Sequence, residues 1–263
     1  MNKTYLFVFV LLAISCKNQV SLPTSHESFF EPPGTVEVAN NLYCDQTEIT
    51  NMDWQEYVYW NKNNHGDHSI EYLGSLPDTT VWENLRSYGE AMRVNRFKHP
   101  AYQYYPVVGV SRNQALQYTE WRTRRVIEMI LVNQEDTRID NSNLDSILKI
   151  KGSSEHLIPV YRLPKETEIV LIQDSYKSLK NEFNTSFGSP HGVKYCSKYC
   201  TVIHELESNA NEYLEDGQMG MFPDAFGKEV QIYDKENEVN AWTGFRNMCS
   251  WVTVDEYLES LNQ

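Results

Sequence analysis

Three side chains that can bind a metal recur at intervals of four residues: Cys196, Cys200 and His204. On a helix, positions four apart lie on one face, so this spacing would gather two thiols and an imidazole. Zinc accepts these ligands but needs a fourth, which His191 or Glu207 could supply. The alternative is a disulfide or ordinary packing of the two cysteines, with His204 beside them.

A cluster of three arginines, Arg122, Arg124 and Arg125, lies in an expected helix. The default interpretation of such a run of charge is a solvated helix face. The alternatives are pairing with acids of the same chain or with an acidic partner, and the sequence does not decide among the three.

The N-terminal residues predict an export signal. Lys3 precedes the apolar run Tyr5–Leu12, which is too short to span a bilayer, and small residues follow before Cys16. The segment Ala13-Ile14-Ser15-Cys16 resembles a bacterial lipobox, in which the signal is removed and the cysteine is acylated. We expect a signal peptide over residues 1–15 and lipid on Cys16, the alternative being an ordinary signal with a chance cysteine.

The residue after Cys16 indicates in which membrane the lipid-anchored protein is expected. Lys17 stands where Asp often retains lipoproteins in the inner membrane, so we expect a lipid-anchored envelope protein of the outer membrane. Residues 16–32 are polar with two prolines and are predicted to be a tether. An exported domain can form disulfides, and four cysteines allow three pairings that the sequence cannot choose among. The four are Cys44, Cys196, Cys200 and Cys249.

The composition is that of a globular protein. The chain has 263 residues, 41% of them hydrophobic and 22% charged, enough to bury one sizeable core or two small ones. The net charge of −13 repels phosphate backbones, so nucleic acid is excluded as a partner.

Three capping boxes mark where helices should begin. Each pairs a Ser or Thr with an acid or amide three residues later: Thr50 with Asp53, Ser111 with Gln114, and Thr253 with Glu256. The middle helix should run to about residue 132 on an apolar stripe. That stripe consists of Ala115, Tyr118, Trp121, Val126, Met129 and Ile130.

Short strands and one insertion complete the predicted domain over residues 33–252, which a C-terminal helix over 253–263 follows. Pro33–Val38, Leu42–Glu48 and Tyr105–Val110 are the strand candidates. Gln134–Glu155 is polar and is predicted to be an exposed insertion.

Five motifs in order resemble the formylglycine-generating-enzyme family, also called the sulfatase-modifying-factor domain. They are Pro33–Val38, Thr47–Asn51, Tyr105–Ser111 with the helix after it, Tyr161–Glu168 (YRLPKETE) and Gly244–Arg246. The resemblance implies an α+β domain with a complex C-type-lectin-like fold and little regular structure. Within the family, residues 97–111 and 121–131 look most like the gliding-motility lipoproteins.

The resemblance also shows which chemistry is missing. Active members oxidise a substrate cysteine with oxygen, using two cysteines that bind copper and lie before the closing Gly-Phe-Arg. The corresponding interval here, Lys228–Thr243, contains no Cys, and Cys249 lies beyond it. Without thiolates copper has no soft ligands there, so the sequence predicts no catalytic residue.

One further family motif supports a calcium site. Ser208–Tyr213 (SNANEY) keeps oxygen-bearing side chains at Asn209 and Glu212, which makes them calcium candidates; the alternative is a loop held by the Asn side chain alone. No other cofactor is assigned.

Three functions compete at this point. The first is a non-catalytic envelope lipoprotein that binds other envelope proteins or glycans within gliding-motility or secretion-type machinery. The others are an active metal-dependent oxidase with relocated cysteines and a carbohydrate-binding module.

Overall fold

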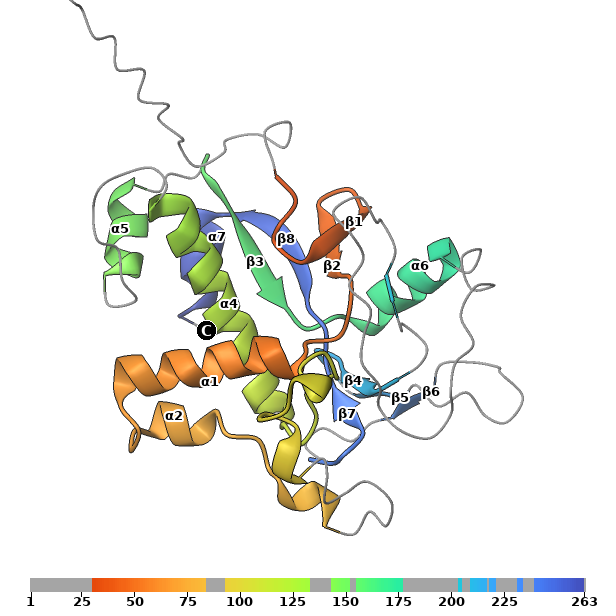
Figure 1. Ribbon diagram of the computed structural model, residues 1–263. Coiled ribbons are helices and arrows are strands. Elements are labelled where there is room, and N and C mark those ends of the chain that lie inside the picture. The colour runs from red at the N-terminus through yellow and green to blue at the C-terminus, as the bar shows by residue number, and fades with distance from the viewer. Residues whose placement is uncertain are drawn as a thin grey trace, which may run out of the picture.

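A four-stranded antiparallel sheet forms the centre of the computed structural model (Figure 1). The structure describes residues 30–83, 93–132, 143–151, 155–176, 203–204, 209–216, 218–220, 231–233 and 239–262. The strand order is β1-β2-β8-β3. These strands are β1 (Thr35–Ala39), β2 (Leu42–Asp45), β3 (Leu157–Arg162) and β8 (Met248–Thr253). The sheet thus joins the two ends of the domain.

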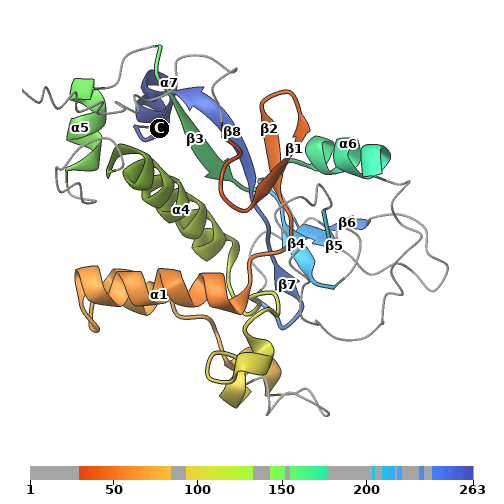
Figure 2. The same cartoon turned by 45° about the horizontal axis from the view of Figure 1, so that its top comes forward.

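Helices cover both faces of this sheet. One face carries α4 (Arg112–Val132), α5 (Leu144–Lys151) and α7 (Val254–Ser260), and the other carries α6 (Glu166–Tyr176) (Figures 1 and 2). Successive residues of a strand point to opposite faces. Tyr43 and Cys249, which are register partners, therefore pack with α4, whereas Cys44 and Met248 pack with α6.

Two further helices and a small second sheet adjoin the centre. The helix α1 (Asn51–His65) crosses near the start of α4 (Figures 1 and 2), and α2 (Ile70–Gly74) follows it (Figure 1). Short 3₁₀ turns stand at Thr80–Trp82 and Pro100–Tyr102. The second sheet has the order β6-β5-β4-β7. Its strands are β4 (Asn211–Tyr213), β5 (Gln218–Gly220), β6 (Gln231–Tyr233) and β7 (Thr243–Gly244).

The three capping boxes are confirmed. Thr50 and Thr253 each accept a hydrogen bond from the backbone N–H three residues on and receive the reciprocal contact. Ser111 and Gln114 exchange the same pair of bonds, at 3.2 and 2.8 Å, at the start of α4. Local side-chain chemistry therefore sets these helix starts.

The core stripe of α4 is confirmed in most positions. Tyr118 is buried and its ring stacks on that of Trp54, with 5.5 Å between centroids. Trp121 is partly buried against the same cluster. The prediction is wrong for Met129, which is 43% exposed, because its position on the last turns of α4 turns away from the sheet.

Two predictions about irregular segments are wrong. Tyr105–Val110 is buried from Pro106 onward but is not a strand, because its backbone hydrogen bonds go to separate segments: Val107 N–H donates to the carbonyl of Ile49 and Gly109 N–H to that of Asn240. Gly109 has a φ of +75°, and a Cβ there would lie 2.6 Å from a backbone oxygen. Gln134–Glu155 is not wholly exposed, because α5 lies within it and buries Leu144 and Leu148 completely.

The helices among the described residues include none that is long and apolar enough to cross a membrane.

Candidate functional site

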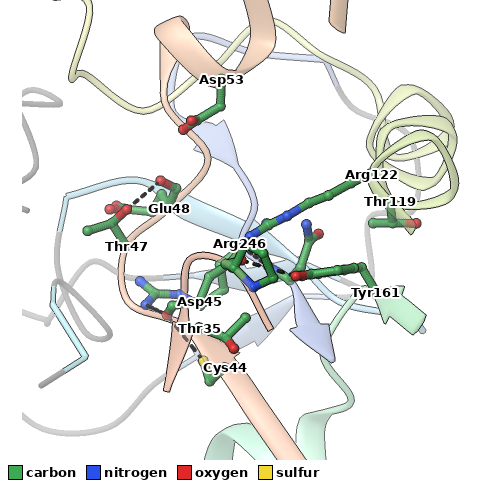
Figure 3. A network of polar contacts seen from close by, with 12 residues as sticks. Thr35, Cys44, Asp45, Thr47, Glu48, Asp53, Thr119, Arg122, Tyr161 and Arg246 are labelled. Atoms are coloured by element: carbon green, nitrogen blue, oxygen red, sulfur yellow. Dashed lines mark hydrogen bonds and ion pairs between the residues drawn. The ribbon is translucent and has the colours of Figure 1, made fainter. Parts of the chain in front are cut away.

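The polar centre of the domain begins at Asp45, the last residue of β2 (Figure 3). One carboxylate oxygen accepts hydrogen bonds from Nη1 of Arg122 at 2.8 Å and from the backbone N–H of Asn247 at 2.9 Å. Arg122 reaches it from the middle of α4, with its guanidinium carbon 4.2 Å from the ring centre of Tyr161. One carboxylate thus joins β2, α4 and the segment before β8.

Arg122 also fixes the place where the chain enters the domain. Its Nη2 donates to the carbonyl of Pro33 at 2.7 Å, and the hydroxyl of Tyr161 donates to the same carbonyl at 3.1 Å. Gly34 follows with a φ of +82°, and a Cβ there would lie 2.7 Å from Arg122 Nη2. The glycine therefore allows both the turn and the close approach of the guanidinium.

A second ion pair, between Arg246 and Glu212, lies beside the first. Nε of Arg246 is 2.8 Å from each carboxylate oxygen, and Nη2 is 2.7 Å from Oε1. Both side chains are 0% exposed. Arg246 also donates to the carbonyls of His204 at 3.0 Å and Asp45 at 3.4 Å, so it ties three separate segments together.

The electrostatics of the two pairs follow from burial. Burial raises the pKa of the Asp45 carboxyl, and Arg122 offsets this only in part. Burial also raises the pKa of Glu212, against the attraction of Arg246. For Arg246 burial acts in the opposite direction, but Glu212 outweighs it and the guanidinium pKa is raised. In each pair the arginine and the carboxylate stabilise each other's charge, because the buried surroundings solvate both charges poorly.

The calcium candidates, Asn209 and Glu212, both lie among the described residues. The structure turns both oxygens of Glu212 toward Arg246, and Asn209 precedes it with a φ of +76°. Among the residues that the structure describes, no three His, Cys, Asp or Glu side chains are grouped as metal ligands. Calcium binding at Asn209 and Glu212 therefore stays a prediction.

The zinc or disulfide candidates are described only in part. Cys196 and Cys200 lie outside the described residues, as does the lipidation candidate Cys16. His204 is described, and its backbone N–H donates to the carbonyl of Gln46 at 2.7 Å. The structure thus places one of these candidates, His204, directly against the buried ion pairs.

The two described cysteines, Cys44 and Cys249, are fully buried free thiols. They pack on opposite faces of the central sheet and neither is bonded, so none of the three two-disulfide pairings is formed, and a disulfide between Cys196 and Cys200 stays a prediction. Burial raises the pKa of Cys44 to about 12 and also raises that of Cys249. Neither thiol is therefore a thiolate at neutral pH, so neither is a ready nucleophile or copper ligand.

The cluster of three arginines proves to be a set of intramolecular ion pairs. Arg122 pairs with Asp45, Arg124 pairs with Asp145 of α5 at 2.8 Å, and Arg125 pairs with Glu128. The default interpretation of a solvated face is wrong, because the fold brings acids from β2 and α5 against the helix.

Sequence reasoning missed Asp45 and the role of Arg246. Only the closing Gly-Phe-Arg motif pointed to Arg246, and no local pattern linked it to Glu212. The arrangement as a whole is a buried polar centre that organises backbone segments.

The comparisons with known proteins agree with this picture. The sequence model of the sulfatase-modifying factor enzyme 1-like domain matches residues 15–171, more than half of the chain. The match covers the motifs through Tyr161–Glu168 and stops before Asn209 and Gly244. Neither curated proteins nor solved structures gave a match. On the family match, and with the α+β fold described above, the chain belongs to the sulfatase-modifying factor enzyme 1-like domain family.

Proposed function

We propose that this chain is a lipid-anchored envelope protein in which the sulfatase-modifying-factor domain serves as an interaction component and has lost the oxidase chemistry. The observation that carries the proposal is the interval Lys228–Thr243, which contains no cysteine where active relatives place their copper ligands. The buried thiols of Cys44 and Cys249 do not replace them.

The polar centre supports a structural role for the family motifs of this chain. Arg246 of the Gly-Phe-Arg motif and Tyr161 of the YRLP motif both hold backbone carbonyls in place. A domain that keeps such contacts, and whose described cysteines are buried thiols, is suited to presenting a surface. The partners that we propose are other envelope proteins or glycans, within gliding-motility or secretion-type machinery.

The loss of oxidase chemistry is tested with the purified protein loaded with copper(I). We expect a cysteine-containing peptide to keep its mass, because the interval Lys228–Thr243 has no cysteine and the two described cysteines, Cys44 and Cys249, are buried thiols. Formylglycine in the peptide, formed by the wild type and lost in Cys196→Ser or Cys200→Ser, would show instead that the active site has moved.

The anchor is tested by fractionation. Cys16→Ala should release the protein from membranes or block its maturation, whereas Lys17→Asp should keep the lipid and move the protein to the inner membrane. An unmodified Cys16 by mass, together with unchanged fractionation of Cys16→Ala, would contradict the proposal.

The partner is sought by crosslinking intact envelopes and purifying the wild type and Cys16→Ala side by side. Components of motility or secretion machinery should be enriched with the anchored protein alone. Enrichment of glycan only would favour the carbohydrate-binding alternative.

A further inference from the structure

Four large apolar side chains are exposed at one end of the domain. They are Phe30, Met129, Val132 and Ile150, which are 42%, 43%, 46% and 82% exposed. Met129 and Val132 stand three residues apart on the last turns of α4, so they share one face of that helix. Exposed apolar side chains that gather in one place are typical of a surface that contacts a partner.

The contacts of the sheet place Phe30 and Ile150 at the same end. The ring of Phe30 packs edge-to-face on Trp251, with 5.4 Å between centroids. Trp251 lies near the end of β8, opposite Pro159 near the start of β3. Helix α5, which carries Ile150, ends shortly before β3 begins and packs with the end of α4 and with Trp251 in one core cluster. Accordingly, α5, the end of α4 and the start of β3 lie together in both views (Figures 1 and 2).

The chain also enters the domain at this end. Phe30 is the first described residue, and it follows the lipidation candidate Cys16 by fourteen positions. An extended chain advances about 3.6 Å per residue, so a lipid on Cys16 would lie within about 50 Å of Phe30. Contact between two tethered partners is intramolecular, so even a weak contact is made for much of the time. The surface beside Phe30 is therefore the first that the lipid can meet.

We propose that this docking end, formed by Phe30, Met129, Val132 and Ile150, lies on the surface of the membrane that holds the lipid anchor. The inference rests on the anchor of the proposed function and adds an orientation to it. The acyl chains keep the domain at the membrane, and the four side chains determine which end faces the lipid. The opposite end of the domain, with α1 and α2, is then presented away from the membrane.

The charge of the chain restricts the lipid that the docking end can meet. Three exposed acids, Glu155, Asp255 and Glu256, stand just before β3 and in the first turn of α7, whereas Lys149 of α5 is an exposed cation. The whole chain carries a net charge of −13. An anionic lipid surface should therefore repel the domain. Docking should depend on apolar contact with a zwitterionic surface.

Ile70 is a matched control for Ile150. Both isoleucines are 82% exposed. Ile70 lies in α2, which is held at the start of α4, because Nε2 of Gln114 donates to the carbonyl of Gly74 at 2.8 Å. The 21 residues of α4 span about 30 Å. The two isoleucines thus report on opposite ends of that helix.

The test uses the full-length acylated protein in nanodiscs of phosphatidylcholine, with methyl-labelled isoleucine and methionine. A spin label on the lipid headgroup broadens the methyl resonances that lie near the membrane. We expect broadening of the Ile150 and Met129 resonances and little change at Ile70. The two isoleucine resonances are assigned by their absence in Ile150→Val and Ile70→Val. Replacing part of the phosphatidylcholine by anionic lipid should reduce the broadening.

Two charge substitutions at exposed positions provide the second readout. Ile150→Asp should lower the ratio of docked to undocked domain by about tenfold, because it removes one apolar side chain from the contact. Most of the Met129 resonance should therefore recover. Ile70→Asp, the matched control, should leave Met129 broadened as in the wild type.

Each outcome decides the proposal. Equal broadening at Ile150 and Ile70, or unchanged broadening of Met129 in Ile150→Asp, would overturn the docking while the anchor stands. An unmodified Cys16 by mass would remove the anchor, and the docking would fall with the proposed function. An Ile150 resonance that changes with the number of chains per disc, and not with the labelled lipid, would assign the docking end to a second copy of the chain instead.

Discussion

Arg246 and Arg96 are both almost fully buried, yet their surroundings differ in one respect. Arg246 meets both oxygens of Glu212, whereas Arg96 has two aromatic rings and one carbonyl, and no carboxylate within the described residues. A buried pair is held by mutual attraction, so losing one member strands the other charge. Removing a cation that has no carboxylate partner leaves no opposite charge buried. Although the two arginines are about equally buried, removing Arg246 should lower the free energy of unfolding far more than removing Arg96.

The largest effect should come from Arg246→Met. This change leaves the Glu212 carboxylate buried without its cation, which should lower the free energy of unfolding by about 5 kcal/mol. The carbonyls of His204 and Asp45 also lose a donor. Urea unfolding followed by circular dichroism measures the change.

The double variant Arg246→Met with Glu212→Leu is the matched control. It removes both charges, so it should be more stable than Arg246→Met alone. A double variant that is less stable than the single one would mean that the pair is not the source of the loss.

Arg122→Met should have the next largest effect, about 3 kcal/mol. Asp45 keeps the Asn247 N–H as a partner, and the arginine side chain is 14% exposed, so water can relieve part of the stranded charge. The measurement is the shift of the urea midpoint.

Arg125→Met is the control on the same helix. Its partner Glu128 lies three residues away and both side chains are partly exposed, so the loss should stay below about 1 kcal/mol. Equal losses in Arg122→Met and Arg125→Met would remove the distinction between buried and surface pairs.

A third ion pair, between Arg162 and Glu168, is partly exposed, and its contribution to stability should depend on pH. Burial raises the pKa of Glu168, but the hydrogen bonds from Arg162 and from Lys165 N–H outweigh it, and the carboxyl pKa is lowered. A carboxyl group whose pKa is lower in the folded state stabilises the fold at pH values above its unfolded-state pKa. This stabilisation is lost as the pH falls through the folded-state pKa.

Glu168→Gln should therefore cost about 1 kcal/mol at pH 7, and wild type and variant should converge in acid. Thermal unfolding from pH 7 down to pH 3 follows this convergence. A difference that stays constant with pH would assign the effect to lost packing or neutral hydrogen bonding.

Some of the fold could be predicted from local sequence. The boxes at Thr50, Ser111 and Thr253 are interactions over three residues, so the sequence alone contains both partners. The short helix α5 was missed because its apolar residues, Leu144 and Leu148, are few and stand in a polar stretch whose burial only the sheet and α7 explain.

Much less of the candidate site than of the fold could be predicted from the sequence. Asp45 and Arg122 are 77 residues apart, and Glu212 and Arg246 are 34 apart. No spacing rule connects such pairs, so Arg122 was assigned by default to a solvated face and Glu212 to calcium. Tyr105–Val110 failed for a related reason, since an apolar run does not specify that its hydrogen-bond partners lie in separate segments.

The smallest change in stability is expected for Arg96→Met, within about 1 kcal/mol of the wild type. The variant loses one hydrogen bond and two cation–π contacts, which stabilise the fold. It also removes a charge and two donors that are buried without partners among the described residues, which is a gain of similar size. Urea unfolding measures the balance; a loss as large as that of Arg246→Met would mean that Arg96 is paired after all, and the contrast between the two arginines would fail.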